Sequence, residues 1–258
     1  MIKKEITYFL TALMFFTRIP IPFRLDYSSE IMNQSQKYYP LVGWVVGGIN
    51  ALVFYLLHFV LPMDICLVLM MISSVLLTGA FHEDGFTDVC DSFGGGYGKE
   101  KILTIMKDSR IGAYGVVGII LLFLLKYLSM KHLAETSILD FLVVLLIAHS
   151  SSRYLSGLMI HTHQYVTDID QSKSKPIANK ALPKKTLFVG LVFTLLPFLW
   201  FQNAWMLLIL PFAYLGKAYL GWYFNKHIGG YTGDCLGTVQ QVTEVLVYLG
   251  FIILWKFI

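Results

Sequence analysis

Residues 65–81 read ICLVLMMISSVLLTGAF and residues 82–96 read HEDGFTDVCDSFGGG. The first stretch is apolar and about long enough to cross a bilayer, whereas the second is dense in carboxylates. Ionisable groups that adjoin a membrane span are costly to keep, so they mark candidate functional sites. The two stretches together predict a membrane protein whose chemistry lies where a helix leaves the hydrocarbon.

The composition of the whole chain is that of a polytopic membrane protein. Of its 258 residues, 56% are hydrophobic and 14% are charged, and the mean hydropathy is +0.65; soluble domains carry about 25% charged residues. Cys66, Cys90 and Cys235 lie far apart, which indicates neither a disulfide framework nor a CxxC metal site. We expect one all-α membrane-embedded domain over residues 1–258. The sequence gives no reason to expect a nucleic-acid partner and leaves a homo-oligomer open.

Apolar run length predicts about seven transmembrane helices. A further helix over Met1–Thr17 is short for a span and ends before Pro20, so we expect it to be interfacial or re-entrant. Residues 23–39 are polar and are expected to form a loop or to lie at the membrane surface. The seven runs are Pro40–Leu61, Ile65–Phe81, Ile111–Leu128, Ile138–Ile160, Leu187–Phe201, Ala204–Phe224 and Leu236–Phe257.

The distribution of Lys and Arg predicts the orientation of these spans. With seven crossings, the N-terminal region and the loops at about 81–110, 161–186 and 225–235 share one side. That side holds fifteen Lys and Arg residues, and the other side holds Lys126, Lys131 and Lys256. Because cytoplasmic loops are enriched in Lys and Arg, the three polar loops are predicted to face the cytoplasm of a bacterial inner membrane.

The acidic stretch predicts a metal site. If it is helical, Asp84, Asp88 and Asp91 fall within a sector of roughly 60° on one face. Carboxylates crowded in this way repel one another, and a divalent cation relieves the repulsion. Oxygen ligands favour Mg²⁺ or Ca²⁺, and HEDGF is not the HExxH of zinc enzymes, so zinc is not expected.

The residues after the acidic stretch include candidate phosphate ligands. In KDSR, Lys107 and Arg110 offer a point charge and a planar fork, and Ser109 is placed with them as a binding residue. A glycine cluster lies between the two motifs. It lets a backbone approach phosphate closely, or forms a plain hinge, and its residues are Gly94, Gly95 and Gly96.

Polar residues inside the last predicted spans are further candidates. Asp234, Thr238, Gln241 and Glu244 form a stripe that enters the final span, where Glu244 needs a partner or a wet cavity. A helix-to-helix hydrogen bond and a substrate contact are equally open for it. Arg153, one turn after a histidine, is expected to meet a carboxylate or a ligand phosphate.

Five motifs together resemble the adenosylcobinamide-GDP ribazoletransferase family, also called cobalamin synthase. The central pair is HEDGFTDVCDSFGGG and IMKDSRIGAYG. Two motifs precede this pair, FFTRIPIP and YYPLVGWVVG, and one follows it, YTGDCLGTVQQVTEV, in the order that the family has. Ser92 stands where glycine is expected after the third aspartate. Residues 161–185 match poorly, so no role is carried over there.

The resemblance implies a Mg²⁺-dependent transfer at the membrane. A hydroxyl of α-ribazole, or of its 5′-phosphate, attacks adenosylcobinamide-GDP at the phosphorus on the cobinamide side, and GMP leaves. Displacement at a diphosphate needs cations at its oxygens. On this reading Mg²⁺ is held by the aspartate face with Glu83 in support, and the diphosphate is clamped by Lys107 and Arg110. Asp108 or Asp234 serves as the base.

Three rival classes remain open on the sequence. CDP-alcohol phosphatidyltransferases place an Ala-Arg pair where this chain has Thr87 and Asp88, and aromatic prenyltransferases carry a second aspartate-rich motif where GYTGDC has one aspartate. A cation-coupled transporter keeps its acids near the bilayer midplane. The acids here cluster at one end of the predicted spans.

Overall fold

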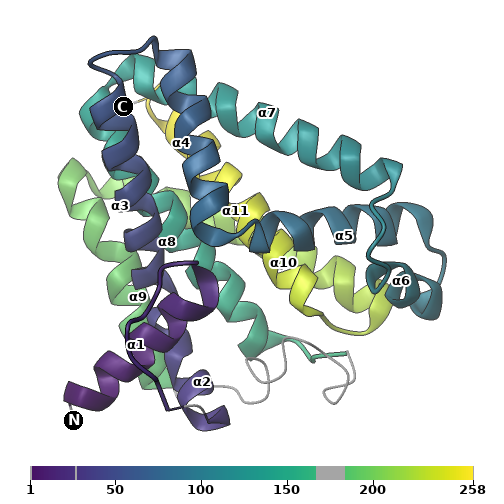
Figure 1. Ribbon diagram of the computed structural model, residues 1–258. Helices are drawn as coiled ribbons and strands as arrows, with labels where there is room; N and C mark the ends of the chain where they lie inside the picture. Colours follow the sequence, from purple (N-terminus) through teal and green to yellow (C-terminus); the bar gives the residue numbers. More distant parts are fainter. Residues whose placement is uncertain (1, 27, 167–183, 258) are drawn as a thin grey trace.

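The computed structural model describes residues 2–26, 28–166 and 184–257 (Figure 1). Apart from one bridge that pairs Tyr165 with Tyr231, these residues form helices, turns and loops, which confirms the all-α prediction. The α-helices are α1 Ile2–Phe16, α2 Ser29–Ser35, α3 Tyr39–Leu57, α4 Met63–Thr78, α5 Phe81–Gly95, α6 Lys99–Met106, α7 Ala113–Thr136, α8 Ile138–Thr162, α9 Lys184–Leu195, α10 Ile209–Ile228 and α11 Gly233–Leu254. Three short 3₁₀ segments are η1 Gln36–Tyr38, η2 Leu196–Phe201 and η3 Ala204–Leu208.

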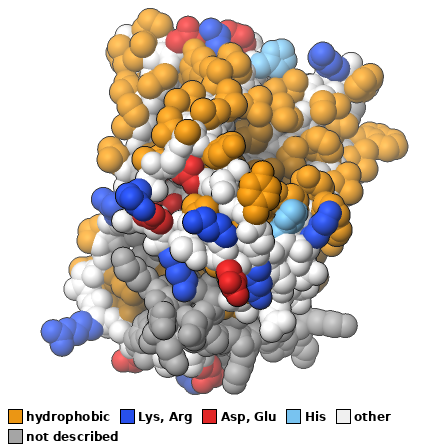
Figure 2. All heavy atoms as spheres, turned by 90° about the vertical axis from the view of Figure 1, so that its right-hand side faces the viewer, with side chains coloured by type: hydrophobic (Ala, Val, Ile, Leu, Met, Phe, Trp, Pro, Cys, Tyr) orange, Lys and Arg blue, Asp and Glu red, His pale blue; other side chains and the backbone are white. Residues whose placement is uncertain are grey.

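Several helices of the described chain are long and apolar enough to cross a bilayer. Five pass this test, and a sixth crossing is added if the bent pair α4 and α5 is counted as one. The predicted number of seven is therefore not confirmed, because the apolar helix over 186–201 is shorter than a span. Figure 2 shows hydrophobic side chains over a broad belt between a charged rim at the top and a second charged band lower down.

The most buried helices, α8 and α11, lie at the centre of the bundle. The helix α3 packs closely on α8, because Gly43 and Gly47 place its backbone against the α8 backbone at His149 and Leu145. A Cβ at Gly47 would lie 2.9 Å from the Leu145 carbonyl oxygen. Glycines at a helix interface allow two backbones to approach this closely.

A sharp bend separates α4 from α5. The two helix axes differ by 91°, and the bend is made by Gly79 and Ala80, both in the left-handed backbone region, with φ of 68° and 58°. The Arg18 side chain lies against Gly79, where a Cβ would collide with it. As a result α5 runs across the bundle instead of continuing α4 (Figure 1), and the acidic stretch is turned out of the path of the preceding span.

The structure corrects several predicted boundaries. The predicted loop at 81–110 is two helices, α5 and α6, and the surface loop predicted before residue 39 contains α2 and η1. The helix α7 continues eight residues past the predicted end at Leu128. Lys126 lies inside α7 and is 6% exposed, so it is a buried bundle residue and not one of the loop cations that indicate orientation. Most of the predicted loop at 161–186 lies outside the described residues.

Candidate active site

The acidic face of α5 is the centre of the candidate site. The condition set on the sequence is met, because the acidic stretch is helical, and Asp84, Asp88 and Asp91 share one face of the helix. Asp84 is exposed, Asp88 is half-buried and Asp91 is 9% exposed. The face thus passes from solvent at one end into a packed contact at the other.

The buried end of this face binds the N-terminus of α7. The Oδ2 atom of Asp91 accepts a hydrogen bond of 2.6 Å from the Gly112 N–H, and its Oδ1 atom accepts one of 2.8 Å from the Gly115 N–H. The N–H groups of a first helical turn have no partner within the helix, and negative charge is stabilised there. A Cβ at either glycine would overlap the carboxylate. Asp91 therefore fixes α7 to α5.

A fourth carboxylate reaches the face from α11. Gly85 of α5 lets the two helices approach so closely that a Cβ there would lie 2.9 Å from the Cα of Asp234. On the same face of α11, the Thr238 hydroxyl donates to the Gly85 carbonyl oxygen at 3.3 Å. Asp234 is half-buried in the first turn of α11. The first part of the predicted stripe, Asp234 and Thr238, therefore faces the acidic helix.

The carboxylates act on one another electrostatically. α5 is not among the five helices that are long and apolar enough to cross by themselves, and it lies beside α6 (Figure 1). Burial, and after it the negative charges of Asp234, Asp84 and Asp91 in that order of importance, raise the pKa of Asp88 to about 7. A cation placed among these groups would be stabilised by the same charges.

The carboxylates of α5 fit a magnesium ion that is only partly coordinated by the protein. Among the described residues, no three or more His, Cys, Asp or Glu side chains are arranged to hold a metal ion by themselves. Mg²⁺ in proteins is commonly held by one or two carboxylates, with substrate phosphates and water completing its shell. Asp84 and Asp88, one turn apart on α5, offer two hard oxygen donors of this kind.

The KDSR segment forms the exposed link between α6 and α7. Arg110 is 87% exposed on its side chain and holds Asp108 through Nη2 and Nε, at 2.6 Å from Oδ2 and 3.0 Å from Oδ1. The hydrogen bonds from Arg110 lower the pKa of Asp108 to about 2. Lys107 and Ser109 are exposed. Gly112, which binds Asp91, follows two residues after Arg110, so this segment is anchored beside the acidic face.

The glycine cluster, left open between a phosphate contact and a hinge, lies at the end of α5. Gly94 and Gly95 are the last residues of α5, and Gly96 is its C-cap. A Cβ at Gly94 would overlap the Tyr114 ring, which assigns this glycine a packing role between α5 and α7. Helix C-termini present carbonyl oxygens and negative partial charge, so a phosphate is less favoured here than at a helix N-terminus.

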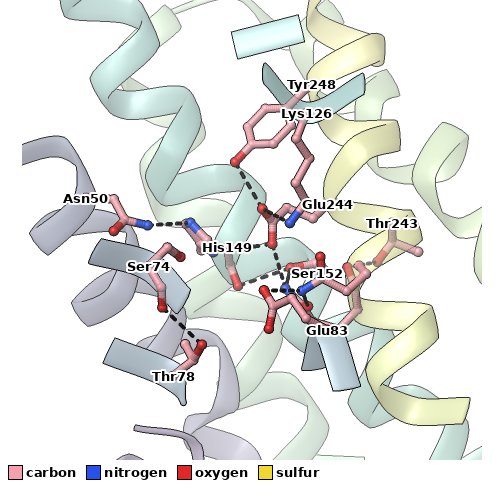
Figure 3. Close-up of polar contacts among 12 residues, drawn as sticks. Asn50, Ser74, Thr78, Glu83, Lys126, His149, Ser152, Thr243, Glu244 and Tyr248 are labelled. Atoms are coloured by element: carbon pink, nitrogen blue, oxygen red, sulfur yellow. Dashed lines mark hydrogen bonds and ion pairs between the residues drawn. The ribbon is translucent and has the colours of Figure 1, made fainter. Parts of the chain in front are cut away.

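Three predicted binding residues lie in the bundle interior instead of on the acidic face. Gln241 Nε2 donates to Glu83 Oε1 at 3.0 Å, and Glu244, 3% exposed, accepts hydrogen bonds within a buried polar network (Figure 3). Arg153 Nη1 donates to the His149 carbonyl oxygen at 3.0 Å, one turn before it on α8. The predicted helix-to-helix bond for Glu244 is therefore present, and a partner for Arg153 lies on its own helix.

Comparison with known proteins gives the same family along the whole chain. The family model described as cobalamin-5-phosphate synthase matches residues 8–252. The chain belongs to this family. It is 44% identical to an adenosylcobinamide-GDP ribazoletransferase of Shewanella amazonensis, with 98% of each chain covered. It is 43% identical to one of Leptospira interrogans, with 99% of this chain and 98% of the relative covered. No solved structure matches the chain.

Within this cobalamin-5-phosphate synthase family member, sequence reasoning missed several residues that build the site. Lys126 forms an ion pair with Glu244 at 2.8 Å, both buried. The sequence does contain a signal for this pair: one predicted span holds a lysine and another holds a glutamate. Charged side chains inside a membrane usually pair with one another, so the two could have been matched. Gly85 and Gly115 were not connected with Asp234 and Asp91, since a glycine in a sequence does not show which backbone or side chain approaches it.

Proposed function

We propose that the protein joins α-ribazole, or α-ribazole 5′-phosphate, to adenosylcobinamide-GDP and releases GMP. The family match over residues 8–252 carries this proposal, together with relatives that bear the ribazoletransferase name. In the reaction a hydroxyl oxygen of the ribazole forms a bond to the phosphorus on the cobinamide side. The bond from that phosphorus to the oxygen bridging to GMP breaks, and the hydroxyl proton passes to a base.

Mg²⁺ is the proposed cofactor, with Asp84 and Asp88 as its protein ligands. When bound, the ion would neutralise the oxygens of the diphosphate and of the leaving GMP. The raised pKa of Asp88 supports this assignment, because it reflects crowded negative charge that a cation would offset. Asp91 and Glu83, predicted with these ligands, hold hydrogen bonds to α7 and α11 and are assigned to fixing α5 in place.

Asp234 is the favoured base for the attacking hydroxyl. It lies on α11 across the close contact at Gly85, near Asp84 and Asp88 but on a separate helix. Asp108 was the alternative, and its hydrogen bonds to Arg110 make it a weak proton acceptor. A base on α11 and metal ligands on α5 would place the hydroxyl and the diphosphate between two helices.

The KDSR segment is proposed to clamp the diphosphate. Lys107 is exposed and Arg110 has only the exposed Asp108 as its ion-pair partner among the described residues, so both can turn to an arriving phosphate. Ser109 offers a hydroxyl between them. The anchor of this segment to Asp91 through Gly112 supports a clamp that stays next to the ligands on α5.

We place this site on the cytoplasmic side of a bacterial inner membrane. The chain is multi-pass, and the excess of Lys and Arg over the N-terminal region and the predicted polar loops supports this orientation. Labelling of single cysteines introduced at Ser109 and at Glu135 in intact cells would test the orientation.

The decisive experiment is a transfer assay with purified protein in liposomes. Adenosylcobinamide-GDP, α-ribazole and Mg²⁺ are incubated with the protein, and both cobalamin and GMP are measured. Equal amounts of the two products are expected, and none is expected when EDTA removes the metal. GMP release without cobalamin would instead indicate a hydrolase, and neither product with any metal would refute the proposed function.

A further inference from the structure

A chain of buried hydrogen bonds connects the centre of the bundle to the acidic helix (Figure 3). Lys126 Nζ donates to Glu244 Oε1 at 2.8 Å, and Gln240 Nε2 donates to Glu244 Oε2 at 2.7 Å. Gln241 Nε2 then donates both to Gln240 Oε1 at 2.9 Å and to Glu83 Oε1 at 3.0 Å. We call these five residues the Glu83 relay. It begins on α7, runs along α11 and ends on α5.

The Glu244 end of the relay is closed to substrate. Both carboxylate oxygens are used, because Tyr248 OH also lies 3.2 Å from Oε1 and His149 Nδ1 lies 3.4 Å from Oε2. Figure 3 shows these side chains pointing toward one another from three helices. Burying an ion pair in this way gives little net stability compared with well-packed apolar residues. Its net contribution to stability therefore does not by itself explain why the chain carries the network.

The Glu83 end of the relay depends on a single contact. Glu83 is 9% exposed, and its Oε2 atom is buried with no hydrogen-bond partner in the part of the chain that the structure describes. Gln241 is thus the side chain that holds the Glu83 carboxylate. The next residue is Asp84, and Asp88 follows one turn later on the same helix. Any rotation of α5 about its axis would move these two carboxylates relative to Asp234.

We propose that Gln241 is a positioning residue for the acidic helix: it sets the rotation of α5 through Glu83 and thereby the placement of Asp84 and Asp88. The inference rests on the proposed function in taking these two carboxylates as metal ligands. Gln241 and Glu244 then act on the reaction through α5 without touching substrate. Residues that orient metal ligands in this manner typically change metal affinity or activity by about 10- to 100-fold when they are replaced.

The test compares two buried positions of α11. Gln241→Leu removes the donor to Glu83, while the Lys126 to Glu244 pair keeps its contact. Thr243→Val is the matched control, because Thr243 is fully buried and its hydroxyl donates to the Val239 carbonyl oxygen of its own helix. Each purified protein is titrated with Mn²⁺ in the absence of substrate, followed by the electron paramagnetic resonance of the free ion, and its melting temperature is measured.

Gln241→Leu is expected to weaken Mn²⁺ binding about tenfold, whereas Thr243→Val is expected to bind as the unmodified protein does. In the transfer assay Gln241→Leu should lower kcat and raise the Mg²⁺ concentration for half-maximal rate. Its KM for α-ribazole should change little. If Gln241→Leu binds Mn²⁺ as tightly as Thr243→Val, the relay only supports the fold and the proposal is refuted.

A second pair of variants keeps the proposal testable if Gln241→Leu fails to fold. Glu83→Gln retains an acceptor for Gln241, so it should bind Mn²⁺ more tightly than Glu83→Leu. The opposite order, or equal loss in both, would refute a positioning role and indicate that the Glu83 charge itself binds the metal. Absence of Mn²⁺ binding to the unmodified protein would also refute the inference.

The same samples separate this inference from the proposed function. If the unmodified protein binds Mn²⁺ and Gln241→Leu weakens that binding, the relay is supported even when no cobalamin forms, and the proposed function alone fails. If cobalamin forms at an unchanged rate and with unchanged Mn²⁺ affinity in Gln241→Leu, the inference alone fails.

Discussion

The carboxylates of Asp84, Asp88 and Asp234 meet at the end of the bundle without an ion pair in the described residues, whereas Glu244 in the interior is fully paired. The interior glutamate accepts from Lys126, Gln240 and Tyr248 and is 3% exposed. An unpaired charge is far more costly in the interior than at a wet surface, so the interior pairing is required for folding. The crowded acids at the rim are tolerated by partial hydration and are left for a ligand.

Replacing a rim acid should have the largest effect, and it should fall on activity. Asp88→Asn removes one of two proposed Mg²⁺ ligands and is expected to lower turnover at least about a thousandfold, which is ~4 kcal/mol of transition-state stabilisation. Its melting temperature should be unchanged or higher, because one repelling charge is gone. Cobalamin formation and thermal unfolding in detergent measure the two. Near-normal turnover at saturating Mg²⁺ would remove Asp88 from the metal site.

Replacing the interior cation should instead act on stability. Lys126→Met leaves the Glu244 charge buried without its cation and is expected to destabilise the fold by about 3 kcal/mol. Lys131→Met is the control, because Lys131 forms a solvent-exposed pair with Asp64 and should leave the melting temperature almost unchanged. Adding Glu244→Gln to Lys126→Met should recover much of the loss. Equal melting temperatures for Lys126→Met and Lys131→Met would show that the interior pair contributes no more to stability than the exposed pair.

The contact between Asp91 and α7 connects the acidic helix to the helix that carries Lys126. Disrupting it should lower both the turnover and the melting temperature. Gly115→Ala puts a methyl group where the Asp91 carboxylate lies and is expected to cost about 2 kcal/mol of stability through overpacking, with lower turnover. Gly48→Ala is the matched control in a helix interior, since its Cβ would meet the Leu146 side chain at an ordinary 3.8 Å. If Gly115→Ala behaves like Gly48→Ala, the Asp91 contact is not needed to fix α7.

The smallest effect is expected at the exposed Asp108. Asp108→Asn should lower turnover less than about tenfold, because a carboxylate already paired with Arg110 is a poor base at neutral pH. Asp234→Asn should lower turnover far more if Asp234 is the base. Rates of cobalamin formation for the two variants, measured side by side at saturating Mg²⁺, give the comparison. A greater loss for Asp108→Asn would reverse the assignment.

Much of the local structure could be predicted from the sequence, because it depends on near neighbours. The spacing of Asp84, Asp88 and Asp91 predicts one helical face, and the helix α5 confirms it. The bend before α5 could not be predicted in the same way. The residues that make it are a glycine and an alanine within an apolar run, and no proline marks the position. The run over 65–81 therefore reads as one uninterrupted crossing.

Errors about single residues have the same origin. Lys126 was counted with the cations of the outer side because hydropathy does not show which polar residue of a span is buried, whereas the ion pair with Glu244 places the lysine in the bundle interior. Gly94 and Gly95 were left open between a phosphate contact and a hinge, because the approach of Tyr114 that explains Gly94 comes from another helix. In both cases the contacting residue lies on another helix, so the sequence next to Lys126 or Gly94 does not reveal it.

By itself the sequence determined that this chain crosses a membrane, that its acids share one helical face, and that a glutamate in the last span needs a partner. These properties follow from hydropathy and from the helical repeat, which are local. Only the tertiary structure decided that Lys126 is that partner, that Asp91 holds α7, and that Asp234 meets Asp88. Such pairings depend on how helices cross, and a crossing is set by bends and by glycine contacts between segments distant in sequence.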